Sequence, residues 1–208
     1  TSSMIDFHGT KITIPLPGRF NISNAIAALT LARELGIPPE DAKKGIESLS
    51  IIRGRVERVD VGQDFTVIVD YAHTDDSLRK LYETFPSSRK IAVLGGTGGG
   101  RDSWKRPVLG KIADEYCDEI IVTNEDPYDE DPLKIINEVS SGVTHHTPKI
   151  IVDRREAIAE AISIARTGDT ILITGKGTDP YIMGPKGTKI KWDDAEVARE
   201  ELQKFLNK

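Results

Sequence analysis

Ile91-Ala-Val-Leu-Gly-Gly-Thr-Gly-Gly-Gly-Arg-Asp-Ser-Trp-Lys-Arg-Pro107 has the pattern of a buried strand followed by a glycine-rich turn and the start of a helix. Five of the six residues from Gly95 to Gly100 are glycine, and they let backbone N–H groups approach a ligand without side-chain obstruction. Each glycine adds conformational entropy that folding must remove, which an ordinary solvent loop does not require. Three cations and an acid follow directly: Arg101, Asp102, Lys105 and Arg106. The stretch therefore predicts a site for an anionic group.

The chain from about Val56 repeats this strand-then-helix rhythm. Short β-branched runs predict strands at 66–70, 90–94, 119–123, 149–152 and 170–174. Amphipathic runs predict helices at 77–85, 106–116, 133–140, 154–165 and 193–206. Such alternation is typical of βαβ units, so we predict an α/β, Rossmann-like fold with a mostly parallel sheet and helices on both faces. In such sheets ligands bind beyond the carboxyl ends of the strands.

Residues 1–52 follow a different pattern. A strand is expected at 11–16, then a helix capped by Asn21 or Ser23 that Gly36 stops after Leu35, then a second helix from Pro38 to about Leu49. So few residues bury little core, and we expect them to close a larger domain. The chain also opens without an initiator methionine, which indicates a fragment. We therefore divide it into 1–52 and 53–208.

Composition excludes several classes of protein. The net charge of -5 provides no bulk attraction to nucleic acid or to acidic membranes, so an anion site must be local. No apolar run is long enough to span a membrane, and no signal peptide begins the chain, so a cytoplasmic location is expected. A single cysteine, Cys117, excludes internal disulfides and multi-cysteine zinc sites, and its surroundings predict a buried, inert thiol.

Polar clusters follow four of the predicted strands. These clusters are Asp70-Tyr-Ala-His-Thr-Asp-Asp76, the glycine-rich turn, Thr123-Asn-Glu-Asp-Pro127 and Thr174-Gly-Lys-Gly-Thr-Asp179. Because carboxyl ends of parallel strands share one edge of the sheet, these groups are expected to meet there.

With Phe20-Asn21-Ile-Ser-Asn24 and Gly54-Arg55-Val-Glu57, these motifs stand in an order that resembles the ATP-dependent Mur ligases of peptidoglycan synthesis. The branch that is most similar comprises the UDP-N-acetylmuramoyl-tripeptide synthetases. Family members have a uridine-nucleotide domain, a central P-loop ATPase domain and a Rossmann-like C-terminal domain. The resemblance covers only the tail of the central domain (1–52) and the C-terminal domain (53–208).

This resemblance implies an amide-forming ligase that uses ATP and Mg²⁺, a UDP-N-acetylmuramoyl-peptide and a free amino acid. The family's Walker A loop, carbamylated lysine and magnesium ligands lie upstream, and no Gly-x-x-x-x-Gly-Lys-Ser/Thr occurs here. We therefore predict no catalytic residue and no metal ligand in this chain. Alone, the chain is expected to be inactive.

For the adenosine side of ATP, the resemblance implies contacts from Asn21, Arg55, Asp70 and His73. Three of them have a simpler alternative. Asn21 could simply cap its helix, and Arg55 could be a solvated surface arginine. His73 could be a core histidine whose hydrogen bonds are satisfied within the protein.

For the incoming amino acid, the resemblance implies Arg106, Asp126, Tyr128, Gly175 and Asp179, with Arg106 holding its carboxylate through a bidentate guanidinium. Of the neighbouring residues, Lys105 is predicted to be solvated and Trp104 to cover the core.

Diaminopimelate-adding members have Asp-Asn-Pro-Arg where this chain has Glu125-Asp126-Pro127-Tyr128, and here Thr178-Asp179 replaces the usual His-Glu. Acids without that arginine favour an ammonium, so a lysine-like substrate is predicted over diaminopimelate. An unliganded acidic loop is the alternative.

Two other functions are compatible with the sequence. A free-standing nucleotide- or dinucleotide-binding module would use Gly96-x-Gly98 and Gly100, although the basic cluster departs from that fingerprint and no acid ends the next strand. A non-catalytic interaction domain is the third possibility. Such a domain has no evident need for Arg55, Asp70, His73 and Arg106.

Overall fold

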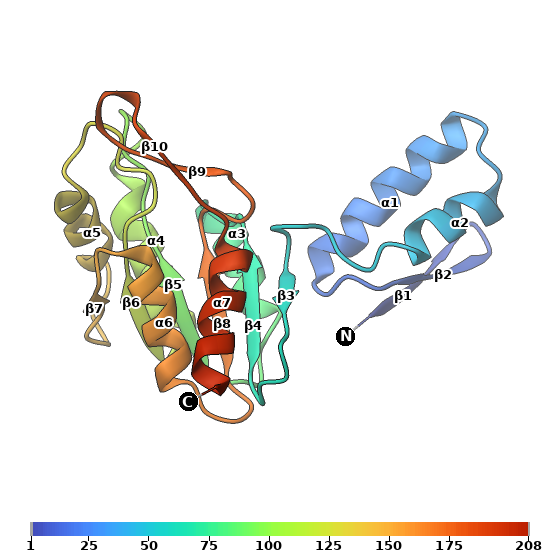
Figure 1. The fold of residues 1–208 in the computed structure, drawn as a ribbon. Coiled ribbons are helices and arrows are strands. Elements are labelled where there is room, and N and C mark those ends of the chain that lie inside the picture. The colour runs from blue at the N-terminus through green and yellow to red at the C-terminus, as the bar shows by residue number, and fades with distance from the viewer. Residues whose placement is uncertain (1, 208) are drawn as a thin grey trace. The chain divides into compact units, whose positions relative to one another are not determined.

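The computed structural model describes residues 2–207 and divides the chain into two compact units, with the boundary between Ile52 and Arg53 (Figure 1). We describe each unit by itself.

The first unit is a β-hairpin packed with two helices. Its elements are β1 (Ser3–Phe7), β2 (Thr10–Ile14), α1 (Arg19–Glu34) and α2 (Pro39–Glu47), and β1 pairs antiparallel with β2. A small core holds Ile14, Leu16 and Ala25. The predicted strand at 11–16 is thus found at 10–14, and β1 was not predicted.

The start of α1 corrects one prediction. Gly18, at φ 96°, precedes the helix, and no side chain caps it. Asn21 lies inside the first turn, where its side chain is buried and its Nδ2 donates to the Pro17 carbonyl (2.7 Å). The prediction that Asn21 or Ser23 caps this helix is therefore wrong. Gly36, at φ 75°, follows the helix end as predicted.

The second unit is a six-stranded sheet with helices on both faces. Its elements are β3 (Glu57–Val59), β4 (Thr66–Asp70), α3 (Asp75–Glu83), β5 (Lys90–Leu94), α4 (Lys105–Tyr116), β6 (Glu119–Val122), α5 (Pro132–Ser140), β7 (Lys149–Ile150), α6 (Arg154–Ile164), β8 (Thr170–Thr174), β9 (Tyr181–Met183), a 3-10 turn (Pro185–Gly187), β10 (Lys189–Lys191) and α7 (Asp194–Leu206). The sheet order is β3-β4-β8-β5-β6-β7, and only β3 runs antiparallel. The predicted α/β fold is confirmed, whereas β3 and the β9–β10 hairpin were not predicted.

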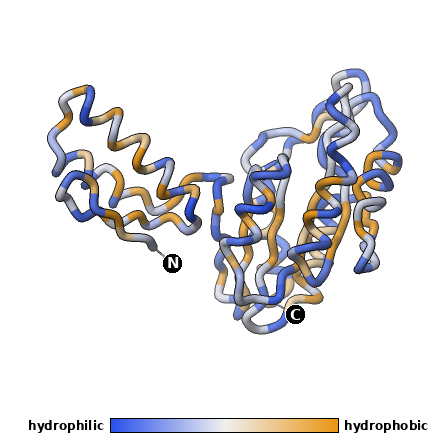
Figure 2. The backbone as a smooth tube through the Cα atoms, turned by 180° about the vertical axis from the view of Figure 1, so that it is seen from behind, coloured by the Kyte–Doolittle hydropathy of each residue, from blue (hydrophilic) through white to orange (hydrophobic). Residues whose placement is uncertain are grey.

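The central strands β4, β5 and β8 are mostly apolar and buried because both faces of the sheet are covered. Alternate residues such as Ile171 and Ile173 pack against α6 and α7, while α3, α4 and α5 cover the opposite face (Figure 1). Figure 2 shows the hydrophobic stretches of this unit gathered in the strands. Cys117 is buried as predicted, and burial raises the pKa of its thiol to about 12.

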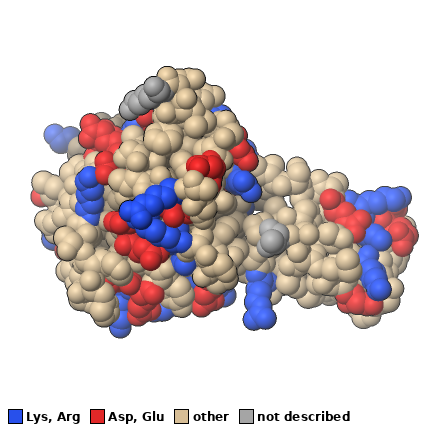
Figure 3. All heavy atoms as spheres, turned by 90° about the horizontal axis from the view of Figure 1, so that it is seen from below, with Lys and Arg blue, Asp and Glu red and all other residues tan. Residues whose placement is uncertain are grey.

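Charges on the surface are mixed in sign. On the face drawn in Figure 3, basic and acidic side chains lie next to one another, so neither sign forms a continuous field. No helix within residues 2–207 is both long and apolar enough to cross a lipid bilayer.

One buried carboxylate holds the connection between α5 and β7. Asp114 of α4 accepts hydrogen bonds from the backbone N–H groups of Thr144 (2.8 Å), His145 (2.9 Å) and His146 (3.0 Å), and from the Nδ1 atoms of both histidines (2.8 and 2.9 Å). Burial opposes ionisation of this carboxyl, but the N–H donors outweigh it and hold its pKa well below the usual range. Asp114 therefore stabilises the fold in its ionised form.

We predict that Asp114→Asn lowers the free energy of unfolding at pH 7 by roughly 2 kcal/mol, because charged hydrogen bonds become neutral or are lost. The native pKa of Asp114 is depressed, so its contribution is complete above the unfolded pKa of about 4 and disappears as the pH falls toward the native pKa. Urea unfolding between pH 7 and pH 2 should show the two proteins converging in acid. Glu115→Gln on the same helix, which removes an exposed pair with Arg79, is the control and should cost under about 1 kcal/mol. A constant gap across this range would contradict the assignment.

Candidate functional site

A cavity of about 240 Å³ lies at the carboxyl edge of the sheet. Residues after β4, β5, β6 and β8 line it, which is the edge that the polar clusters predicted. Six of the nine predicted site residues contribute to its wall: His73, Arg106, Asp126, Tyr128, Gly175 and Asp179. Arg55 and Asp70 are not among the lining residues, and Asn21 belongs to the first unit.

The glycines after β5 are explained first by packing. A Cβ atom on Gly95 would lie 2.7 Å from the Thr123 carbonyl oxygen, and one on Gly98 would lie 2.8 Å from the Pro127 carbonyl carbon. Gly98 also donates its N–H to the Asp126 carbonyl (2.7 Å). The turn thus lies flush against the loop after β6. Side chains at Gly95 and Gly98 would overlap this loop, so glycine is required at both positions.

Tyr128 is held in a left-handed backbone conformation, with φ 51°. Its N–H bonds the Met183 carbonyl of β9 (3.1 Å), and a Cβ on Gly99 would lie 2.8 Å from its ring. The ring therefore lies close against Gly99 in the cavity wall, and a non-glycine residue at positive φ is a form of strain that functional sites often keep.

Arg106 is almost fully buried, with 2% of its surface exposed. Its Nη1 donates to Glu138 (2.6 Å), and its Nη2 donates to Glu130 (2.9 Å) and to the Thr97 carbonyl (2.9 Å). Two carboxylates of the chain therefore already neutralise this guanidinium. Its Nε is buried without a hydrogen-bond partner.

A cation beside Arg106 is better exposed. Arg101 lines the same cavity, and among residues 2–207 no carboxylate lies within ion-pair distance of its guanidinium. Lys105 pairs with Asp102 (2.8 Å). Trp104 is 66% exposed, so the prediction that it covers the core is wrong. The single signal for Arg101 was its place in the basic cluster, which did not separate it from Arg106.

Acidic side chains line the cavity from the ends of β6 and β8. Glu125 is buried and accepts a hydrogen bond from Thr97 Oγ1 (2.8 Å), and its burial raises the pKa of the carboxyl. Asp126 and Asp179 both accept hydrogen bonds from Lys176 Nζ (2.8 and 3.0 Å). The acids that were predicted to attract an ammonium are thus partly neutralised by a lysine that the sequence did not single out.

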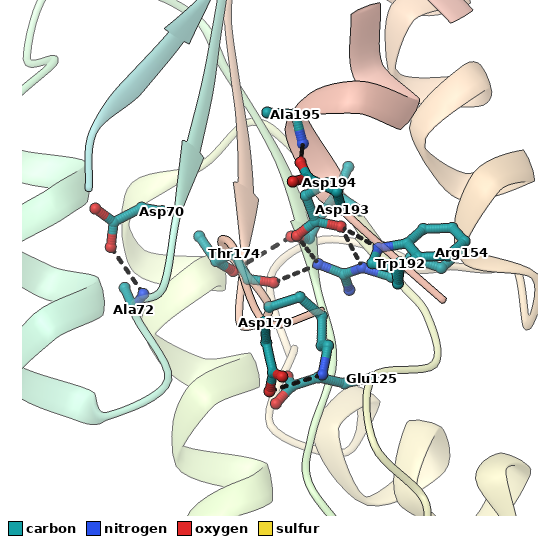
Figure 4. Close-up of polar contacts among 12 residues, drawn as sticks. Asp70, Ala72, Glu125, Arg154, Thr174, Asp179, Trp192, Asp193, Asp194 and Ala195 are labelled. Carbon is teal, nitrogen blue, oxygen red and sulfur yellow. Dashed lines mark hydrogen bonds and ion pairs between the residues drawn. The ribbon is translucent and has the colours of Figure 1, made fainter. Parts of the chain in front are cut away.

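A buried arginine connects the elements at the carboxyl edge of the sheet. Arg154 donates to both oxygens of Asp194 (2.8 and 2.7 Å), to the Thr174 carbonyl (2.7 Å) and to the Asn124 carbonyl (3.3 Å). Figure 4 shows its guanidinium facing Asp194, with Trp192 beside the pair. The contacts join the N-termini of α6 and α7 to the ends of β6 and β8.

The predicted adenosine residues have two different environments. Asp70 is buried, and its oxygens accept the N–H groups of Val56 and Ala72 (2.7 Å each), so it fastens neighbouring backbone (Figure 4). Arg55 is exposed and lies 4.9 Å from the centre of the Tyr71 ring. His73 is exposed rather than in the core, and its ring packs edge-on against the same tyrosine.

Within residues 2–207, no group of three or more His, Cys, Asp or Glu side chains is arranged to hold a metal ion.

Comparisons with known proteins show to which family the chain belongs. The family model of the Mur ligase glutamate ligase domain matches residues 54–177. The chain is 44% identical over 194 residues to the UDP-N-acetylmuramoyl-L-alanyl-D-glutamate--2,6-diaminopimelate ligase of Bacillus licheniformis, an alignment that covers 92% of the chain and 40% of that protein. The ligase with the same name from Solibacter usitatus is 41% identical over 207 residues, which cover 97% and 42%.

Solved structures share the fold. A UDP-N-acetylmuramoyl-L-alanyl-D-glutamate--2,6-diaminopimelate ligase superimposes with a TM-score of 0.70 at 30% identity, covering 99% of this chain and 43% of that one. A Mycobacterium tuberculosis folylpolyglutamate synthase has a TM-score of 0.65 at 20% identity, covering 83% and 44%, and shows likeness of fold alone. The chain spans about two-fifths of the length of the curated relatives named above. From the match over residues 54–177, we conclude that the chain belongs to the Mur ligase family.

Proposed function

We propose that this chain is the C-terminal portion of an ATP-dependent, cytoplasmic ligase of peptidoglycan precursor synthesis. In this proposal residues 53–208 bind the free amino acid that is joined to a UDP-N-acetylmuramoyl-peptide, and residues 1–52 close the central ATPase domain. The carrying observation is the cavity at the carboxyl edge, which has carboxylates from the ends of β6 and β8 and the guanidinium of Arg101, a group without an ion-pair partner among residues 2–207. A zwitterionic amino acid requires both kinds of group.

The chemistry that we propose is that of the ligase family to which the chain belongs. In the proposed reaction, ATP phosphorylates the carboxylate of the nucleotide-linked peptide, the amine of the amino acid attacks, and phosphate leaves as the amide bond forms. ATP and Mg²⁺ would be held mainly by parts of the ligase beyond this chain. Arg55, Tyr71 and His73 offer a cation and two aromatic faces that fit the adenosine. Residues 53–208 would therefore act by positioning the amine.

The contacts reassign the carboxylate-binding role. Arg106 satisfies Glu130 and Glu138, so we propose that it fixes the glycine-rich turn against α5, and that Arg101 binds the carboxylate of the amino acid. A guanidinium without an internal partner keeps its full capacity for a bidentate bond.

Matched substitutions separate the two arginines. Arg106→Met should lower the free energy of unfolding by roughly 2 kcal/mol, because it leaves two partly buried carboxylates uncompensated. Arg101→Met should change stability by less than about 0.5 kcal/mol and raise the KM of the complete ligase for the amino acid about tenfold or more. Urea unfolding and steady-state kinetics measure both. Normal KM in Arg101→Met would refute the reassignment.

The lysine-like substrate remains our proposal for the amino acid, within the broader class of diamino acids. Tyr128 supplies no cation where diaminopimelate-adding members have arginine, and Asp179 is partly exposed. In a competition assay with the complete ligase, lysine should be incorporated in preference to meso-diaminopimelate. Tyr128→Arg is the matched variant and should move the preference toward diaminopimelate. Preferential incorporation of diaminopimelate by the unaltered ligase would show that the proposal is wrong.

The isolated chain should not turn over ATP, because no P-loop occurs in its 208 residues. Phosphate release measured with residues 1–208 should equal the blank with or without Mg²⁺, while the complete ligase provides the positive control. Robust turnover by the isolated chain would contradict the assignment of the phosphate site to another part of the protein.

A further inference from the structure

Lys176 is a lysine without access to solvent. It follows β8 within Gly175-Lys-Gly177, and none of its surface is exposed. Its Nζ lies 2.8 Å from Asp126 Oδ2 and 3.0 Å from Asp179 Oδ2. A buried ammonium needs such partners, because the cost of removing it from water is offset only by close opposite charge.

The two acids belong to the cavity, whereas the lysine does not. Asp126 and Asp179 line the cavity, and Lys176 lies behind them. The second oxygen of Asp126 accepts the N–H of Met183 (2.8 Å), so both of its oxygens are occupied. Among the described residues, Asp179 Oδ1 has no hydrogen-bond partner, and the side chain is 35% exposed. Asp126 and Asp179 together form the acidic wall of the cavity, and one carboxylate oxygen of this wall is therefore left for a ligand.

The charge of this wall depends on the buried lysine. Asp126 and Asp179 carry two negative charges, and Lys176 cancels one of them at hydrogen-bond distance. Unit charges a few ångströms apart near a protein surface interact strongly enough to change binding more than tenfold. The electrostatic potential that a substrate side chain experiences at these acids would thus depend on Lys176.

We propose that Lys176 is a specificity-determining residue, which acts through Asp126 and Asp179 to set the charge of the substrate side chain that the cavity accepts. The proposal rests on the function proposed above. With Lys176 present, the wall accepts an ammonium through one free oxygen. Without it, two uncompensated carboxylates would select a purely cationic terminus such as that of lysine over the zwitterionic terminus of diaminopimelate.

Opposite charge changes at one ion pair test this role in the complete ligase. The measured quantity is the ratio of kcat/KM for lysine to kcat/KM for meso-diaminopimelate. Lys176→Met should raise the ratio about tenfold, because it adds a negative charge to the wall. Asp179→Asn should lower the ratio about fivefold, because it removes one. Lys149→Met is the matched control: it removes an exposed lysine paired with Glu160 outside the cavity, and the ratio should stay within twofold.

The outcomes separate the possible failures. If folded variants lose activity toward both amino acids equally, so that no ratio moves more than twofold, Lys176 is a structural residue and the inference is overturned. If thermal melting shows that Lys176→Met does not fold, Asp179→Asn and Asp126→Asn test the inference instead. Both substitutions must then lower the ratio. If the unaltered ligase joins neither amino acid, the proposed function fails and this inference fails with it.

Discussion

The buried guanidinium of Arg154 determines how the carboxyl edge of the sheet is assembled. It comes from the first residue of α6 and reaches the Asp194 carboxylate at the start of α7 and the carbonyls of Thr174 and Asn124. Among the described residues, the buried Asp194 carboxylate would otherwise keep only the Trp192 Nε1 donor (2.8 Å), and a buried oxygen left without a donor costs about 1–3 kcal/mol. Parallel strands end in carbonyl groups that no neighbouring strand satisfies, and here a single fork of donors closes the ends of β6 and β8. The loops that carry the site residues depend on this junction.

A second constraint is the close approach of two loops. The glycine-rich turn after β5 lies against the loop after β6, and side chains at Gly95 or Gly98 would overlap that loop. Arg106 joins the two loops from one side through Thr97 and Glu130. Glu125, hydrogen-bonded to Thr97 Oγ1, joins them from the other. These contacts explain why so many glycines stand together: they permit packing between loops, which in turn orients the lining residues.

Much of this fold could be read from the sequence, for physical reasons. Buried parallel strands such as Thr170–Thr174 are short apolar runs, and their alternation with amphipathic helices leaves few other architectures. The elements that were missed lack those signals. β1 alternates exposed and half-buried residues, and β10 is fully exposed, so neither has an apolar run. The start of α1 was misplaced because a glycine precedes it, whereas Asn21 uses its amide on a carbonyl.

The location of the site could be predicted from the sequence, but the ion pairs within it could not. Sequence shows which residues follow a strand, and so it located His73, Arg106 and Asp179 at one edge. It does not show which charges meet in space. Arg106 and Lys176 both have acid partners that are distant along the chain or hidden by a turn, and pairing removes most of their capacity to bind a ligand. Within the described part of the chain, the groups that remain unpaired at the cavity are few, chiefly the Arg101 guanidinium and one oxygen of Asp179. Paired charges hold the wall rigid, and the few unpaired ones orient a substrate at little further cost in ordering.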